Sequence, residues 1–177
     1  MTRREIRDHK FKILFSLLIN NDDVDTVVDR YFENLPDDDD SDNSYVNSSQ
    51  KSYENINLKK ENNIITDDNS LDLEETRLFI NEKEIDEIKE FIKDLLPKVD
   101  ELDEKISKAL TDWKITRIPK AELIILRMCL YEIYYTDLDT AVSINEAVLL
   151  SKVYGMSDDK SNRFMNAVLS TIIKQNG

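Results

Sequence analysis

Glycine and proline are scarce in this chain, which has two glycines and three prolines in 177 residues. Proteins with many strands need such residues in their turns, so their scarcity favours long helices. The single cysteine, Cys129, cannot form an internal disulfide and suits a reducing compartment. No apolar run is long enough to span a bilayer, and the charged N-terminus does not lead into an apolar signal sequence. These absences predict an all-α protein of the cytoplasm.

Several kinds of catalytic and metal site lack the residues they require. His9, expected on an exposed helix face, is the only histidine, which disfavours both a zinc site with Cys and His ligands and a Cys–His nucleophile. Neither Gly155 nor Gly177 has a partner at the spacing of a phosphate-binding loop. The acid-rich stretches lack the glycine turn and the ligand spacing of a calcium loop. We therefore expect no enzymatic activity, no catalytic or metal-binding residues and no cofactor.

Acidic side chains outnumber basic ones by 37 to 24, and the net charge is −13. The charge is unevenly distributed. Residues 37–75 hold twelve acids and three lysines, which gives −9, whereas residues 1–12 hold five bases and two acids, which gives +3. From residue 114 to the end, eight bases and seven acids give +1. The average charge would repel a polyanion, but the two ends of the chain would not.

Helical periodicity is clear near the N-terminus. Residues 4–19 place apolar side chains roughly on one side, and the polar turn at 20–23 offers N-cap residues for a second helix. That helix, at 24–35, carries a regular apolar stripe and ends at Pro36. From 37 to 72 the periodicity is lost among Asp, Asn and Ser. So little apolar surface cannot offset the entropy of ordering, and we expect an acidic disordered insert there.

The helical period returns near residue 73 and continues almost to the end. A stripe at 85–96 is bent or broken by Pro97 and continues to Trp113. Residues 121–135 are apolar on almost every face, which predicts the buried central helix of the fold. We expect a compact bundle of six or seven helices in two sub-bundles. The predicted parts are a helical hairpin at 1–36, the insert at 37–72 and the helical remainder of the same domain at 73–177.

Three polar positions carry structural predictions. Ser143 and Glu146 have the spacing of a capping box, and Gly155 stands where a left-handed C-cap would end that helix. Arg127 lies within the apolar central helix. Because an unpaired buried charge is expensive, we expect it to have a carboxylate partner.

Four segments of the chain together carry a recognisable pattern. They are Arg3-Arg4-x-x-Arg7 leading into Leu14-Phe15, Trp113-x-x-x-Arg117-Ile118 leading into Ile125-Leu126-Arg127-x-x-x-Tyr131-Glu132, Ser143-Ile144-Asn145-Glu146-Ala147, and Asp159-Lys160-Ser161-x-Arg163-Phe164-x-Asn166-x-Val168-Leu169. In order and spacing they resemble the NusB family of bacterial transcription antitermination factors. The likeness covers residues 1–20 and roughly 100–173. The acidic insert is unmatched.

The resemblance implies an all-α fold of two small bundles and a role in transcription antitermination. It also implies binding to the boxA segment of nascent RNA jointly with NusE, a small-subunit ribosomal protein. In this family the complex joins RNA polymerase and suppresses premature termination, notably in ribosomal RNA operons. A homodimer that hides the RNA-binding face is compatible with the resemblance.

The expected RNA contacts are cations from both ends of the chain, meeting on one side of the fold as a single platform. Guanidinium groups bind phosphate bidentately and stack on bases, and helical spacing puts Arg3, Arg7 and Lys10 on one side. The alternative is a basic N-terminus that merely keeps the chain soluble. Phe164 has the spacing of a core residue. The expected contacts are Arg3, Arg4, Arg7, Lys10, Lys152, Lys160 and Arg163.

The resemblance assigns Glu122, at the expected exposed start of the central helix, to contact with NusE. The alternative is a solvated acid favoured by the helix dipole. The chain departs from the family pattern where Ala167 and Asp94, or a neighbour, replace usual glycines. One other interpretation stays open: a helical protein-interaction module without RNA binding that works through its acidic insert. A third, an RNA-methyltransferase accessory domain, would need a nucleotide-binding α/β region, so we do not expect that chemistry here.

Overall fold

The computed structural model describes residues 1–18, 22–34, 82–111, 113–155 and 158–176. All regular secondary structure in these ranges is helical, which confirms the all-α prediction. Residues 1–33 and 81–177 form one compact unit, and residues 34–80 are grouped as a second. The predicted disordered insert at 37–72 lies outside the described residues, so the insert and the boundaries drawn around it stay predictions.

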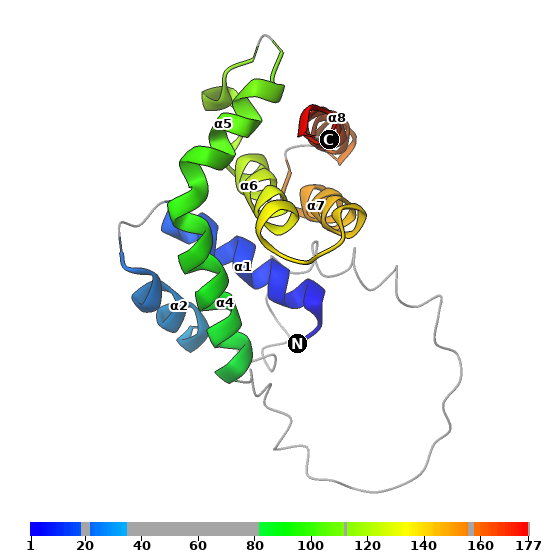
Figure 1. The fold of residues 1–177 in the computed structure, drawn as a ribbon. Helices are drawn as coiled ribbons and strands as arrows, with labels where there is room; N and C mark the ends of the chain where they lie inside the picture. Colours follow the sequence, from blue (N-terminus) through cyan, green and yellow to red (C-terminus); the bar gives the residue numbers. More distant parts are fainter. Residues whose placement is uncertain (19–21, 35–81, 112, 156–157, 177) are drawn as a thin grey trace, which may run out of the picture. The chain divides into compact units, whose positions relative to one another are not determined.

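The first group of helices consists of α1 (Arg3–Leu17), α2 (Val24–Glu33) and α4 (Glu82–Leu95), each of which packs against the other two (Figure 1). The apolar stripes seen in the sequence form these contacts. Val28 of α2 and Ile92 of α4 are both completely buried. Burial of such side chains contributes about 1.5–3 kcal/mol each, which explains why short helices with modest propensity are stable here.

The second group consists of α5 (Val99–Ala109), α6 (Lys120–Tyr135), α7 (Thr140–Tyr154) and α8 (Asp158–Asn176). Helix α6 packs against the other three and also against α1, so it joins the two groups (Figure 1). This arrangement confirms the predicted pair of sub-bundles. None of the described helices is both long and apolar enough to cross a membrane.

Proline marks two of the helix boundaries. The 3-10 helix η1 (Leu96–Lys98) contains Pro97 and separates α4 from α5, as expected of a residue that cannot continue an α-helix. A second 3-10 helix, η2 (Ile115–Arg117), precedes Pro119, which is the N-cap residue of α6. Both prolines therefore lie where one helix gives way to the next.

Helix α6 is the buried centre that the sequence predicted. Ile125 and Leu126 are completely buried. Arg127 donates two hydrogen bonds, both 2.7 Å long, to the carboxylate of Asp103 on α5, which confirms the expected carboxylate partner. Cys129 is also buried, and this burial raises the pKa of its thiol, so the side chain behaves as a small apolar group.

His9 is half-buried between α1 and α2, so its predicted exposure is wrong. Its Nδ1 lies 2.8 Å from the hydroxyl of Tyr31, and its ring packs against Phe32 with centroids 5.6 Å apart. Burial is the main cause that lowers the pKa of His9. The neutral imidazole therefore belongs to the contact between these two helices.

Helix α7 begins before the predicted capping box. Its N-cap residue is Asp139, whose carboxylate accepts the backbone N–H groups of Ala141 and Val142 at 2.8 and 3.3 Å. Ser143 lies inside the helix and is 1 % exposed, so the capping box is wrong. The Ser-x-x-Glu spacing occurs equally between adjacent turns of a helix, and here Glu146 reaches α1 instead.

Gly155 ends α7 with φ −74° and ψ 162°, an extended conformation, so the predicted left-handed C-cap is also wrong. Glycine is required at this position because the neighbouring atoms leave no room for a Cβ atom. A Cβ on Gly155 would lie 2.3 Å from the carbonyl oxygen of Ser151 and 2.6 Å from Oγ of Ser161. The absence of a side chain lets the first turns of α8 approach the end of α7.

Candidate nucleic-acid interface

The arginine-rich start of α1 is held by a capping box. The side chain of Thr2 accepts the backbone N–H of Glu5 at 3.2 Å, and the carboxylate of Glu5 accepts the N–H of Thr2 at 2.6 Å. Arginines in a first turn oppose the helix dipole, and Glu5 offsets part of this effect. The local sequence thus keeps Arg3 and Arg4 in the first turn of a regular helix.

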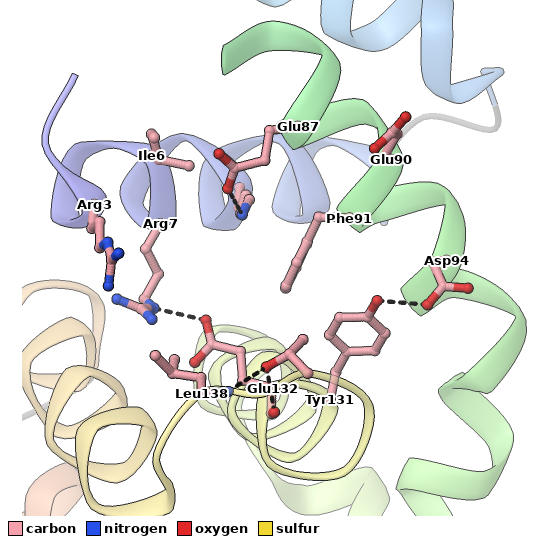
Figure 2. A pocket seen from close by; sticks show the side chains of 12 residues that line it. Arg3, Ile6, Arg7, Glu87, Glu90, Phe91, Asp94, Tyr131, Glu132 and Leu138 are labelled. Carbon is pink, nitrogen blue, oxygen red and sulfur yellow. Dashed lines mark hydrogen bonds and ion pairs between the residues drawn. The ribbon is translucent and has the colours of Figure 1, made fainter. Parts of the chain in front are cut away.

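Side chains of α1, α4 and α6 surround an open groove of about 600 Å³. Arg3, Arg7 and Lys10 line it together, so the structure confirms that these three lie on one side of α1. Figure 2 shows the arginines of α1 near Glu132 of α6 at one end of the groove. The other lining residues are Ile6, Glu87, Glu90, Phe91, Asp94, Tyr131, Glu132, Thr136 and Leu138.

Arg7 is held by carboxylates of the second helix group. Its Nε donates to Oε1 of Glu132 at 2.9 Å (Figure 2), and its Nη1 lies 3.4 Å from Oε2 of Glu146. The side chains of Arg7 and Glu132 are 12 % and 7 % exposed. Loss of Arg7 would leave the buried carboxylate of Glu132 without this cation. Arg7 therefore joins α1 to α6 and α7, and little of its guanidinium is open to a phosphate.

The first two arginines are more accessible. Nη2 of Arg4 lies 3.5 Å from Oε1 of Glu146, and the Arg4 side chain is 35 % exposed. Arg3 is exposed and makes no ion pair with any described residue. The start of α1 therefore presents one cation in solvent and a second that is shared with a carboxylate.

Lys10 is enclosed, with only 8 % of its surface exposed. Its Nζ donates to Oε1 of Glu87 at 2.9 Å and lies 4.3 Å from the centre of the Phe91 ring. A cation placed between a carboxylate and an aromatic face stabilises the packing of α1 on α4. This geometry does not favour the predicted RNA contact at Lys10.

The α4 side of the groove is fixed by Asp94. Its carboxylate accepts a hydrogen bond from the hydroxyl of Tyr131 (Figure 2). It accepts another from Nζ of Lys98. The bond from Lys98 and, after it, the bond from Tyr131 lower the pKa of Asp94. Burial is the main cause that raises the pKa of Tyr131, and its hydrogen bond to Asp94 is the second. At or next to the position where the resemblance led us to expect glycine, this chain therefore has a carboxylate that ties α4 to α6.

The second predicted group of cations lies outside the groove. Lys152 of α7 and Lys160 and Arg163 of α8 are all exposed, and none makes an ion pair with a described residue. Phe164 is half-buried against the core, in agreement with the spacing that it shares with core residues. All three cations are thus open to solvent.

Tyr154 links the end of α7 to α1. Its hydroxyl donates to Asp8, and its ring stacks on Phe11 with centroids 4.2 Å apart. The structure therefore brings Arg3, Arg7 and Lys10 to one groove and leaves the cations of α7 and α8 elsewhere on the surface. A single platform formed by both groups stays a prediction.

Glu122 is 3 % exposed, so its predicted position at an exposed helix start is wrong. Its Oε1 accepts a hydrogen bond of 3.0 Å from Oγ of Ser161 on α8. The side chain thus connects α6 to α8 beneath the surface.

The model of the NusB family matches residues 51–174 of the sequence. The chain belongs to the NusB family. The transcription antitermination protein NusB of Clostridium botulinum (strain Kyoto / Type A2) is 33% identical over 174 residues, which cover 98% of this chain and 100% of the relative. That of Clostridium tetani is 32% identical over 176 residues, which cover 99% of each. That of Macrococcus caseolyticus is 45% identical over 85 residues, 48% of this chain and 64% of the relative.

A solved structure of T. maritima NusB shares the fold of this NusB family member. The two superpose with a TM-score of 0.64 at 20% sequence identity, over 99% of this chain and 92% of that one. The curated relatives named above are transcription antitermination proteins. Membership of this family confirms the expectation of a non-enzymatic role in transcription.

Sequence reasoning missed the carboxylates that bind the α1 arginines. Glu132 lies 125 positions from Arg7, and Glu146 lies 142 positions from Arg4. The periodicity of a single helix therefore cannot predict these ion pairs. One signal was available for Glu132. A carboxylate within an apolar helix needs a cation for the same reason that Arg127 needs a carboxylate.

Proposed function

We propose that this NusB family member binds boxA-type single-stranded RNA together with NusE. Within the RNA polymerase antitermination complex it would promote processive transcription of ribosomal RNA operons in the cytoplasm. Family membership and the accessible arginines at the start of α1 support the proposal. The observation that carries it is Arg3, which is exposed and makes no ion pair with a described residue. A guanidinium group so placed can bind phosphate and stack on an unpaired base.

The RNA contacts divide by accessibility. Arg7 and Lys10 are enclosed by their partners, and we assign them to holding α1 against α4, α6 and α7. The accessible cations would neutralise phosphates of the RNA, which makes binding sensitive to salt. They are Arg3, Arg4, Lys152, Lys160 and Arg163.

Contact with NusE is proposed at the start of α6. Glu122 is buried there and would support the surface rather than touch the partner. Nearby in sequence, Trp113 is 53 % exposed, and Arg117 and Lys120 are also exposed. An exposed tryptophan beside cations suits a protein interface, where Trp and Arg contribute most of the binding energy.

Charge reversal at Arg3 tests the proposal. Fluorescence anisotropy with a labelled boxA RNA and NusE present compares Arg3→Glu with Lys174→Glu, which reverses an exposed charge in the last turn of α8. We expect Arg3→Glu to weaken binding by about tenfold or more and to reduce the salt slope by about 0.7 per lost contact. Lys174→Glu should change the affinity little. Equal weakening by both variants would show that only the net charge matters.

A further inference from the structure

We propose that Glu146 is a carboxylate latch, a built-in competitor that occupies Arg4 until an RNA phosphate displaces it. The inference rests on the proposed RNA-binding function and concerns the regulation of that same site. It starts from the position of Glu146 on α7, where its two oxygens face two arginines of α1. Oε1 lies 3.5 Å from Arg4, and Oε2 lies 3.4 Å from Arg7.

Charge balance explains why the latch matters. Three ion pairs connect two arginines with two glutamates, whose charges cancel: Arg4, Arg7, Glu132 and Glu146. A phosphate that approaches the start of α1 therefore meets the free charge of Arg3 and a neutral cluster beside it. Arg4 can turn toward that phosphate only after its bond to Glu146 is given up.

The accessibility of the four side chains shows where exchange can occur. Glu132 and Arg7 are 7 % and 12 % exposed and are joined at 2.9 Å, so this pair stays in place. Glu146 is 15 % exposed, whereas Arg4 is 35 % exposed and makes the longest ion pair of the cluster. Only the contact between Arg4 and Glu146 is both long and open to solvent.

Release of Arg4 would not leave Glu146 without a cation. Its second oxygen still faces Nη1 of Arg7, so the carboxylate keeps a positive neighbour when Arg4 turns to a phosphate. The usual penalty for stranding a buried charge is thereby avoided. The exchange is a shift of one arginine between two anions, which requires no movement of a helix.

The test is Glu146→Gln, which keeps the shape of the side chain and removes its charge. Titration of the variant with labelled boxA RNA in the presence of NusE should show binding up to about fivefold tighter than the wild type, because the RNA no longer has to displace a solvent-accessible ion pair from Arg4. The salt dependence should stay nearly the same, because Arg4 contacts a phosphate in the complexes of both proteins. A purely structural role for Glu146 would weaken binding instead.

Two controls separate the latch from general effects. Glu104→Gln removes a charge of the same sign on α5, where the side chain is 64 % exposed and pairs with Lys108, and should not change the affinity. Arg4→Ala should abolish the gain, so that Arg4→Ala and Arg4→Ala/Glu146→Gln bind RNA equally. Circular dichroism confirms that each variant is folded. Glu146→Asp replaces Glu146→Gln if the latter does not fold, since the shorter side chain draws the carboxylate away from Arg4.

Each outcome decides between the two proposals. Equal or weaker binding by folded Glu146→Gln, with normal binding by the wild type, overturns the latch and leaves the RNA-binding function standing. An equal gain from Glu104→Gln also overturns the latch, because net charge alone would explain it. No binding by the wild type with NusE present overturns the proposed function and the latch with it.

Discussion

Replacement of Arg7 by alanine should strongly destabilise the fold. The change removes the guanidinium that joins α1 to α6 and α7 and leaves Glu132 without the cation that binds it at 2.9 Å. Because the Glu132 side chain is only 7 % exposed, water cannot fully hydrate the remaining charge. The penalty is therefore that of an unpaired buried carboxylate, in addition to the lost packing of the arginine itself.

The size of the effect follows from the burial of both partners. Removal of one member of a buried pair costs about 3–5 kcal/mol, and pairs that are 12 % and 7 % exposed need little correction for solvent screening. The second carboxylate, Glu146, retains Arg4, so it adds little to the loss. We expect Arg7→Ala to lower the free energy of unfolding by about 3 kcal/mol or more, out of a typical total of about 5–15 kcal/mol.

Urea unfolding monitored by circular dichroism measures this loss at an unchanged m-value. The matched control is Glu104→Gln, which removes the partner of Lys108. The side chains of Lys108 and Glu104 are 67 % and 64 % exposed, so the loss of this pair should change the free energy of unfolding little. If Arg7→Ala cost no more than Glu104→Gln, the assignment of Arg7 to a buried structural pair would be refuted.

Three further substitutions test other parts of the structure. Gly155→Ala should destabilise by about 1–3 kcal/mol, because its Cβ would lie 2.3 Å from the carbonyl oxygen of Ser151; an unchanged thermal midpoint would contradict this. Burial lowers the pKa of His9 from its ordinary 6.5, so the unfolded chain gains this proton first and stability falls as the pH drops below 6.5. Just below pH 6.5, His9→Gln should remove a slope of at most about 1.4 kcal/mol per pH unit, measured by urea unfolding. Ser143→Ala should leave the stability unchanged or slightly raised, because this buried hydroxyl has no hydrogen-bond partner among the described residues; a loss above about 1 kcal/mol would argue against it.

The helices themselves could be predicted because each carries its own apolar period. The stripe at 24–35 became α2, and the apolar stretch at 121–135 became the buried α6. The sequence also predicted that the partner of Arg127 would be a carboxylate, since a buried cation requires one. Its identity as Asp103 depended on how α5 packs against α6.

The candidate site was less predictable because it depends on contacts between distant helices. Helical spacing placed Arg3, Arg7 and Lys10 on one side of α1, but nothing in that spacing revealed that α4 and α6 would enclose two of them. Glu122 illustrates the same limit. Its position in a first turn suggested solvent, whereas Ser161 of α8 covers it.

The most direct test of the account is a titration of boxA RNA with the wild-type chain, with and without NusE, at about 50 and 200 mM salt. The proposed joint binding predicts tighter binding when NusE is present. Five phosphate contacts, from Arg3, Arg4, Lys152, Lys160 and Arg163, predict that binding weakens about a hundredfold between the two salt concentrations. Absence of binding at the lower salt concentration with NusE present would contradict the central claim.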